Sequence, residues 1–415
     1  MRNQEPVHPS SFTMVKLLKA ILLLLFCLPR INDAASDSLL SLNELIEEAI
    51  ANNPELRALH ADFEATESRI SWFSHVADPL VAVEFANDRR MYSVTQQIPF
   101  PTKIAQRRGF AQSEAEYDYF LYIDKEQRVI RQVKQAYAEL YLIHAKKRAT
   151  EKSIAFLEQI HNIVRQKYSI NEAPQAEVLM AQVQLAKAEN QLILWTDDLM
   201  IAQANLNTLL NRDLEMILLP PGEIVETADT TSLSSLYALA QQNQPLLKAL
   251  QSKQEAVEIK QSLARHAYLP DLTFKYTYED MNNDIHNSKY MVGLTVPLWF
   301  LDKQNKSLRE SAAYVRGLSA RYENLMNHTR LAVKHAKTRV EKYQHMIDLY
   351  ENSVLPQTEA AVKSALGAYE VNKVDFQVLL ESLKSLVEAE YDYEEARANR
   401  FIAMAELEET IGLSE

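Results

Sequence analysis

Cysteine is nearly absent from this chain of 415 residues, and the only one, Cys27, lies in a segment with the pattern of a signal peptide. If translation begins at Met14, two lysines precede an apolar stretch at residues 20–28, and small residues at 34–36 form a cleavage site. We expect residues 1–36 to be an extension and signal peptide. The remaining chain would have no disulfide, thiolate metal ligand or cysteine nucleophile.

Glycine is also scarce, with six in the whole chain, far below the average usage of roughly 7%. Long uninterrupted helices and short loops are therefore expected. The net charge of −12 provides no basic excess to neutralise phosphates, which argues against nucleic acid as a partner. Beyond the N-terminal segment no stretch reaches the roughly 18 apolar residues of a transmembrane helix, so a membrane crossing would use strands. The sequence leaves open whether Cys27 is lipidated, although Phe26 stands where a small residue normally precedes an acylated cysteine.

Patterns that carry chemistry are missing as well. The ten histidines include no pair at zinc-ligand spacing on a helix face, and His328 and His335, seven residues apart, lack a neighbouring cluster of ligands. There is no nucleophile elbow, phosphate-binding glycine loop or dinucleotide fingerprint. We expect neither an enzyme nor a resident metal or cofactor.

What the chain does contain is the same plan twice. Three sets of landmarks recur: Pro54 and Pro79 as Pro245 and Pro270 at an offset of 191, Pro99 as Pro297 at 198, and Tyr168-Ser169-Ile170-Asn171 as Tyr369-Glu370-Val371-Asn372 at 201. The step from 191 to 198 places a seven-residue insertion in the second hairpin. Self-similarity of this kind indicates a duplication.

The duplication divides the chain into a first repeat at 37–212, a linker at 213–231 and a second repeat at 232–415. The first repeat is predicted to contain a β-hairpin at 79–99 and helices at 104–168 and 174–211. The second contains a β-hairpin at 270–298 and helices at 303–368 and 375–411. The linker holds the helix-breaking sequence Pro220-Pro221-Gly222.

Between the prolines the hydrophobic period is two. One face of each hairpin is predicted to be apolar and aromatic, with residues Val81, Val83, Phe85, Tyr92, Val94, Gln96 and Ile98 in the first and Leu272, Phe274, Tyr276, Tyr278, Tyr290, Val292, Leu294 and Val296 in the second. Strands of about nine residues are long enough to cross a bilayer at a tilt. The alternative is a half-buried sheet in a water-soluble protein.

The helical parts have coiled-coil periodicity. The helix after the first turn alternates spacings of three and four at Val178, Ala181, Leu185, Ala188, Leu192, Trp195, Leu199, Ala202, Leu206 and Leu209. Each repeat is thus predicted to end in an antiparallel helical hairpin, with a break near Leu355 because Pro356 interrupts the second long helix. Asn171 and Asn372 should adopt the left-handed conformation at the turns.

With these patterns the chain resembles the TolC-like outer membrane efflux channels, and within them the heavy-metal type of CzcC and CusC. The residues that carry the resemblance are the Asn-Pro-Glu-Leu opening at Asn53, the run Gln-Gln-Ile-Pro-Phe-Pro-Thr-Lys at 96–103, the two Tyr-x-(Ile/Val)-Asn turns, and the helix ends at 204–206 and 405–407 with Gly412. The chain departs from the family pattern at Thr102, Asn171 and Asn372, where the family has glycine.

The resemblance implies a mainly α fold with a small β part, in which three chains form a 12-stranded β-barrel on a helical tunnel. It implies a passive export duct in the outer membrane of a Gram-negative bacterium, with a large periplasmic part. The expected partners are two further copies, outer membrane lipid, a periplasmic adaptor and an inner-membrane pump of the resistance-nodulation-division type. The exported compound, a metal cation or a small toxic molecule, is not identified.

The resemblance also assigns residues to two sites. The gate candidates at the periplasmic mouth are Tyr369, Lys373, Val374, Asp375, Val378 and Glu381, together with Glu177, which stands at the position equivalent to Val378. The family often has a basic residue at Val374 and an acidic one at Val378, so Glu177 would supply the missing carboxylate. The adaptor-docking candidates are Ser169, Ile170, Asn171, Glu172, Glu370, Val371 and Asn372. A second hypothesis is a periplasmic adaptor or another coiled-coil interaction protein, although adaptors usually have one helical hairpin and more glycine.

Overall fold

The computed structural model describes residues 39–86, 89–224, 231–281, 285–295 and 303–413. The chain divides into a unit Met1–Leu39 and a unit Leu40–Glu415, and the helices and strands described below belong to the second. The expected signal peptide, with Cys27, lies outside the described residues.

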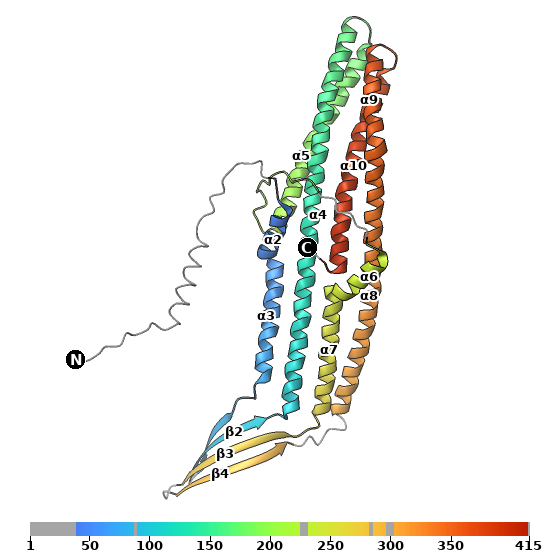
Figure 1. Ribbon diagram of the computed structural model, residues 1–415. Coiled ribbons are helices and arrows are strands. Elements are labelled where there is room, and N and C mark those ends of the chain that lie inside the picture. Colours follow the sequence, from blue (N-terminus) through green and yellow to red (C-terminus); the bar gives the residue numbers. More distant parts are fainter. Residues whose placement is uncertain (1–38, 87–88, 225–230, 282–284, 296–302, 414–415) are drawn as a thin grey trace, which may run out of the picture. The chain divides into compact units, whose positions relative to one another are not determined.

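Two β-hairpins form one antiparallel sheet in the order β1-β2-β3-β4 (Figure 1). The strands are β1 (Leu80–Ala86), β2 (Arg89–Ile98), β3 (Asp271–Met281) and β4 (Ile285–Thr295). The two hairpins come from opposite halves of the chain and join through the pairing of β2 with β3. In the described part of the chain, β1 and β4 have no strand on their outer sides.

The register of the sheet gathers the predicted apolar residues that the structure describes on one face, whereas Val296 lies outside the described residues. Tyr92 pairs with Tyr278 and Tyr276 with Tyr290, and the ring centroids lie 6.4 Å and 5.2 Å apart. This face is open to the surroundings in the single chain, since Tyr290 is 81% exposed and Val292 is 67% exposed. The alternation read from the sequence therefore matches the pairing of the strands.

The seven-residue insertion in the second hairpin mostly lengthens its strands. β3 and β4 have 11 residues each, whereas β1 and β2 have 7 and 10. The added residues continue the ladder as far as the pair Met281 and Ile285, because extending the ladder satisfies backbone groups that a loop would leave to water.

Helices make up most of the rest of both halves. The first half has α2 (Leu42–Asn52), α3 (Pro54–Ser74), α4 (Pro101–Ser169) and α5 (Gln175–Leu209). The second has α6 (Leu233–Asn243), α7 (Pro245–His266), α8 (Lys303–Leu349), a π-helical turn η1 (Tyr350–Val354), α9 (Leu355–Glu370) and α10 (Phe376–Ile411). With 69 residues, α4 extends on the order of 100 Å at 1.5 Å per residue. In the described residues no helix has the length and apolarity to cross a membrane.

The prolines at 54 and 245 mark equivalent helix starts. Each is the first residue of its helix, where a missing amide donor costs nothing. The preceding side chains cap the free amides: Asn53 Oδ1 accepts from Glu55 N at 2.9 Å, and Gln244 Oε1 accepts from Leu247 N at 2.8 Å. The duplication is thus visible in the local chemistry of the caps.

The helices form a layer in which α4 has a central place (Figure 1). Toward the sheet the lateral order of contacts is α3, α4, α7 and α8, and toward the turns it is α5, α4, α10 and α9. Each residue of the predicted seam on α5 is buried or half-buried. The fold class predicted from the sequence, two copies of a β-hairpin followed by a long helical hairpin, is confirmed for the single chain. The break in the second long helix that was expected near Leu355 is also found. There α8 ends at Leu349, the π-helical turn η1 follows, and α9 begins at Leu355.

Candidate functional site at the helical turns

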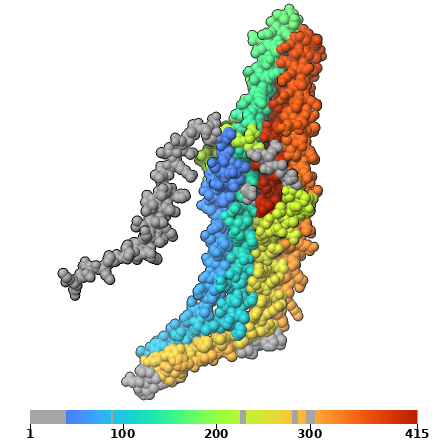
Figure 2. Space-filling model, viewed as in Figure 1, coloured from blue at the N-terminus to red at the C-terminus, as the bar shows by residue number. Residues whose placement is uncertain are grey.

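The two turns share one backbone geometry and lie at the same end of the layer (Figure 2). Asn171 and Asn372 have φ of 60° and 58°, which confirms the predicted left-handed conformation. Each turn closes with the bond pattern of a Schellman motif, from Glu172 N to Lys167 O and from Lys373 N to Ala368 O, both at 2.8 Å. The offset of 201 is retained in this pattern, so the turns are equivalent in backbone.

The side chains at the turns are not equivalent, since Lys167 joins the first turn to the second. Its Nζ donates to the carbonyl oxygen of Tyr369 at 2.8 Å and to Asn372 Oδ1, and it lies 4.9 Å from the centroid of the Tyr369 ring. Lys167 is buried. The equivalent position in the second repeat is Ala368, so no reciprocal bond can form.

A second link runs from α9 to α5. Tyr369, buried against Phe376 with the ring centroids 5.6 Å apart, donates its hydroxyl to Glu177 Oε2 at 2.6 Å. Burial, and then the hydrogen bond to Glu177, raises the pKa of the Tyr369 phenol well above its ordinary value. The hydroxyl therefore stays protonated and remains a donor at physiological pH.

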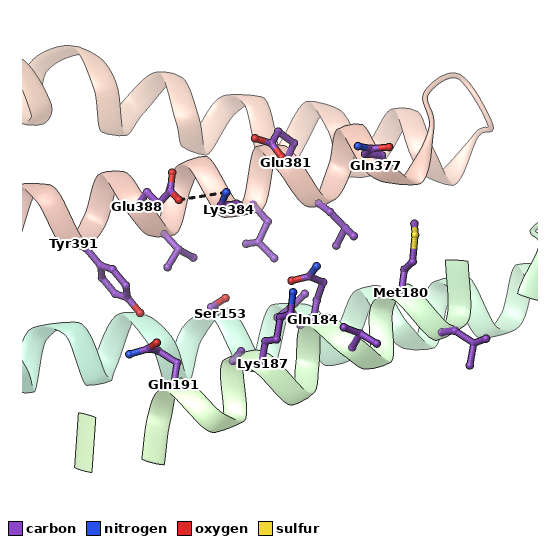
Figure 3. Close-up of a pocket in the computed structure, with 17 residues that line it drawn as sticks. Ser153, Met180, Gln184, Lys187, Gln191, Gln377, Glu381, Lys384, Glu388 and Tyr391 are labelled. Atoms are coloured by element: carbon purple, nitrogen blue, oxygen red, sulfur yellow. Dashed lines mark ion pairs between the residues drawn. The ribbon is translucent and has the colours of Figure 1, made fainter. Parts of the chain in front are cut away.

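Glu381 borders a groove between α5 and α10 with α4 as its floor, and Figure 3 shows its side chain on the side of α10 that faces α9. The groove has a volume of about 750 Å³, and its walls include Met180 and Gln184 on α5 and Lys384 on α10. Glu381 also borders a smaller groove of about 280 Å³ between α9 and α10, so it stands on the ridge that α10 forms between the two. In the described chain its carboxylate has no ion-pair partner, whereas Glu388 pairs with Lys384 at 3.6 Å.

The other gate candidates are spread over the turn and the ridge. Val378 is exposed and shares the smaller groove with Glu381. Lys373 and Asp375 are exposed at the second turn, and Val374 packs partly buried on the apolar cluster that contains Tyr369. The structure thus brings Tyr369 to Glu177 and Val378 to Glu381, but it does not bring all the candidates into one cluster.

The docking candidates are exposed at both turns. Each turn presents one apolar side chain at the same position of its motif, Ile170 at 62% exposure and Val371 at 60%. Ser169 is held in its own turn by a bond from Oγ to Gln166 O. The flanking Glu172 and Glu370 are acidic.

Lys167 and Phe376 belong to this site and were missed in the sequence. Lysine at the end of a helix ordinarily caps its own carbonyls, and only the position next to Tyr168, inside an apolar seam, hinted at burial. No group of three or more histidine, cysteine or acidic side chains suited to a metal occurs among the described residues.

Comparison with known proteins places this geometry in a structural context. No family model matches the chain, and no curated protein matches it in sequence. Among solved structures, a crystal structure of CusC matches 93% of this chain and 96% of its own chain with a TM-score of 0.78 and 13% identity. VceC, an outer membrane protein of Vibrio cholerae, matches 90% and 96% with a TM-score of 0.75 and 15% identity.

The CmeC outer membrane channel of Campylobacter jejuni matches 93% of this chain and 90% of its own, with a TM-score of 0.74 and 13% identity. The chain has the fold of these outer membrane channels. The resemblance read from the sequence is therefore confirmed at the level of the fold, over nearly the whole described chain.

Proposed function

We propose that this protein is a passive outer membrane duct of a tripartite efflux or secretion system, which exports small compounds or metal cations from the periplasm. The observation that carries the proposal is the sheet. It has four strands, an exposed aromatic face and two unpaired edges in the described residues. In lipid an open edge leaves backbone groups unsatisfied, so the sheet requires further copies.

A ring of three chains pairs the backbone groups on both edges of each sheet. β1 and β4 run antiparallel to each other in the order β1-β2-β3-β4, so β4 of one copy can pair with β1 of the next and continue the antiparallel pattern. Three copies give twelve strands and no edge. Such a contact is head-to-tail and closes by rotation.

The helices support the same contact. The edge that carries β1 also carries α5, whose main neighbour in the chain is α4. Away from α4, α5 exposes Ile193, Leu194, Met200 and Ile201, each 46% to 63% exposed. A run of large apolar side chains on one helix marks an interaction surface, and we assign it to the neighbouring copy.

The turns are then the periplasmic end. Ile170 and Val371 repeat around the ring as apolar contacts flanked by acidic residues, which suits the helical hairpin of a periplasmic adaptor and, through it, an inner-membrane pump of the resistance-nodulation-division type. We assign the mouth to Tyr369, Val378 and Glu381, with the bond from Tyr369 to Glu177 holding the closed arrangement. Three Glu381 carboxylates near one axis would favour cations.

The test is direct. The protein should require detergent for extraction from the outer membrane, form a trimer in light scattering, and form pores in planar bilayers. Ile201→Glu should shift the trimer toward monomer because it places a charge in the apolar contact, while the exposed control Asp198→Glu should not. A monomer that is soluble without detergent would refute the duct and favour an adaptor.

A further inference from the structure

In the two central strands the polar face of the sheet is more sheltered than the apolar face, which is the reverse of a sheet in a water-soluble protein. Along β3 the polar residues Thr273, Lys275 and Thr277 are half-buried, whereas Phe274 and Tyr276 between them are exposed. The strand β2 has the same alternation over most of its length. Side chains on the concave face of a curved sheet shield one another, while those on the convex face spread apart. The polar face is therefore the inner side of the curve.

Lys275 lies near the middle of this polar face. It pairs with Thr95 of β2 and with Met291 of β4. Thr273 and Thr277 flank it along β3 on the same face, because residues two apart in a strand point to the same side. None of the three threonine hydroxyls has a hydrogen-bond partner among the described residues. Lys275 is thus surrounded by hydroxyl groups that are available to a solute.

The acids of β3 that could neutralise Lys275 are paired with other lysines. Asp271 and Glu279 lie on the same face of the strand, four residues to either side. Asp271 Oδ1 accepts a hydrogen bond from Lys103 Nζ at 2.8 Å, and Glu279 Oε1 accepts one from Lys289 Nζ at 2.6 Å. Lys275 itself has no ion-pair partner in the part of the chain that the structure describes. Its positive charge is therefore not compensated within the sheet.

Glu84 of β1 is a further acid on the polar face, and it lies nearer the hairpin loops than Lys275. Its partner in the ladder is Met91, which is four residues from Thr95. Four residues of strand span roughly 13 Å, which is more than the Debye length of about 8 Å at physiological ionic strength. The carboxylate of Glu84 therefore does not cancel the charge of Lys275.

We propose that three copies of Lys275, one from each chain of the duct, form a basic ring in the barrel lumen that favours the passage of small anionic solutes such as carboxylates and phosphates. This inference rests on the proposed duct, because only the closed barrel turns the polar faces toward one another. Rings of lysine select anions in pores, and the neighbouring threonine hydroxyls can donate hydrogen bonds to an anion. A metal ion would pass this ring more readily as an anionic complex than as a free cation.

Reversal potentials in planar bilayers test the basic ring. With unequal potassium chloride on the two sides, the reversal potential gives the ratio of chloride to potassium permeability. At an ionic strength of about 0.1 M, three charges roughly one Debye length from a permeating ion change this ratio about two- to fivefold. Lys275→Gln should therefore lower the ratio by this factor, whereas Lys275→Arg should retain the wild-type ratio. If the glutamine variant does not assemble, Lys275→Thr serves as a second neutral variant.

Arg90→Gln is the matched control, because it removes a positive charge from the other face of the same sheet. Arg90 is exposed and pairs with Phe85 of β1 and Asp280 of β3 on the apolar face. Its variant should have the wild-type permeability ratio. An equal fall of the ratio in Arg90→Gln and Lys275→Gln would overturn the basic ring, since the effect would then come from the net charge of the protein.

A divalent anion provides a second readout. Replacing chloride with hydrogen phosphate doubles the charge of the anion, so Lys275→Gln should lower the ratio of phosphate to potassium permeability about three- to tenfold. A loss no larger than that for chloride would overturn the electrostatic role of Lys275. Wild-type pores with unchanged ratios in Lys275→Gln would overturn the basic ring alone, whereas a wild type that forms no pores would overturn the duct and the ring together.

Discussion

Replacing Lys167 with methionine should loosen the junction between the two turns. Methionine retains the apolar stem, so the change removes mainly the ammonium group. The carbonyl of Tyr369 is then left buried without its donor, which costs about 1–3 kcal/mol, and the contact of the amine with the Tyr369 ring is lost at about 0.5–2 kcal/mol. Part of this is recovered because Asn372 is exposed and can bond to water, and because a buried charge no longer needs to be desolvated. We expect a net loss of about 1–2 kcal/mol, which changes the equilibrium between joined and separated turns about 5- to 30-fold.

Hydrogen exchange measures this equilibrium locally. In wild type the amides of Glu172 and Lys373 are protected by the bonds that close the turns, and Lys167→Met should speed the exchange of peptides covering both turns by the factor above. Arg165→Met removes an exposed charge two residues away and serves as the control, with wild-type exchange expected. Equal exchange in Lys167→Met and wild type would show that the buried amine does not hold the turns together.

Three further changes test other parts of the chain. Glu381→Ala should alter single-channel conductance or its block by multivalent cations. The control Glu388→Ala, which removes a carboxylate already paired with Lys384, should alter neither. Unchanged values for Glu381→Ala would show that Glu381 does not belong to the mouth. Gly412→Ala should lower the free energy of unfolding in urea by about 2–4 kcal/mol, because φ is +73° and a Cβ would lie 2.6 Å from the carbonyl group of Asn243, the last residue of α6. Asn211→Gly, at the equivalent cap, should change the free energy of unfolding little. A much smaller loss in Gly412→Ala would contradict the close approach. Burial raises the pKa of Glu390; the charge of Lys152 opposes this rise, and the charges of Glu359 and Glu394 add to it. The contribution of Glu390 to stability is therefore present at acid pH and is lost as the pH rises through its folded pKa. Glu390→Gln should thus stabilise the protein at neutral pH but not at acid pH, and a constant difference across a pH series of urea titrations would refute the assignment.

Much of the fold was readable because its signals are local. A strand alternates with period two and a coiled-coil seam with spacings of three and four, so the positions of Tyr276 and Tyr290 or of Leu206 already specify a face. Asparagine at 171 and 372 specifies a left-handed turn by its own conformational preference. The doubled landmarks then related the two halves without any contact between them being known.

The site was less predictable because its contacts join segments far apart in the chain. Lys167 and Asn372 are separated by 205 positions, and Tyr369 and Glu177 by 192. Apart from its position next to Tyr168 inside an apolar seam, nothing near Lys167 in the sequence distinguishes it from the other lysines of α4. Likewise the offset of 201 at the turns was visible in the sequence, but the π-helical turn η1 was not.

The sequence by itself determined the elements, their duplication and the apolar face of the sheet, since each follows from the preferences of residues close together in the chain. Tertiary structure alone decided that the two hairpins join through β2 and β3, that a buried lysine ties one turn to the other, and that the second long helix contains the π-helical turn η1. These outcomes depend on which long helices pack together and in what register. That choice is made by the sum of many weak contacts along α4, α8 and α10, which no local pattern records.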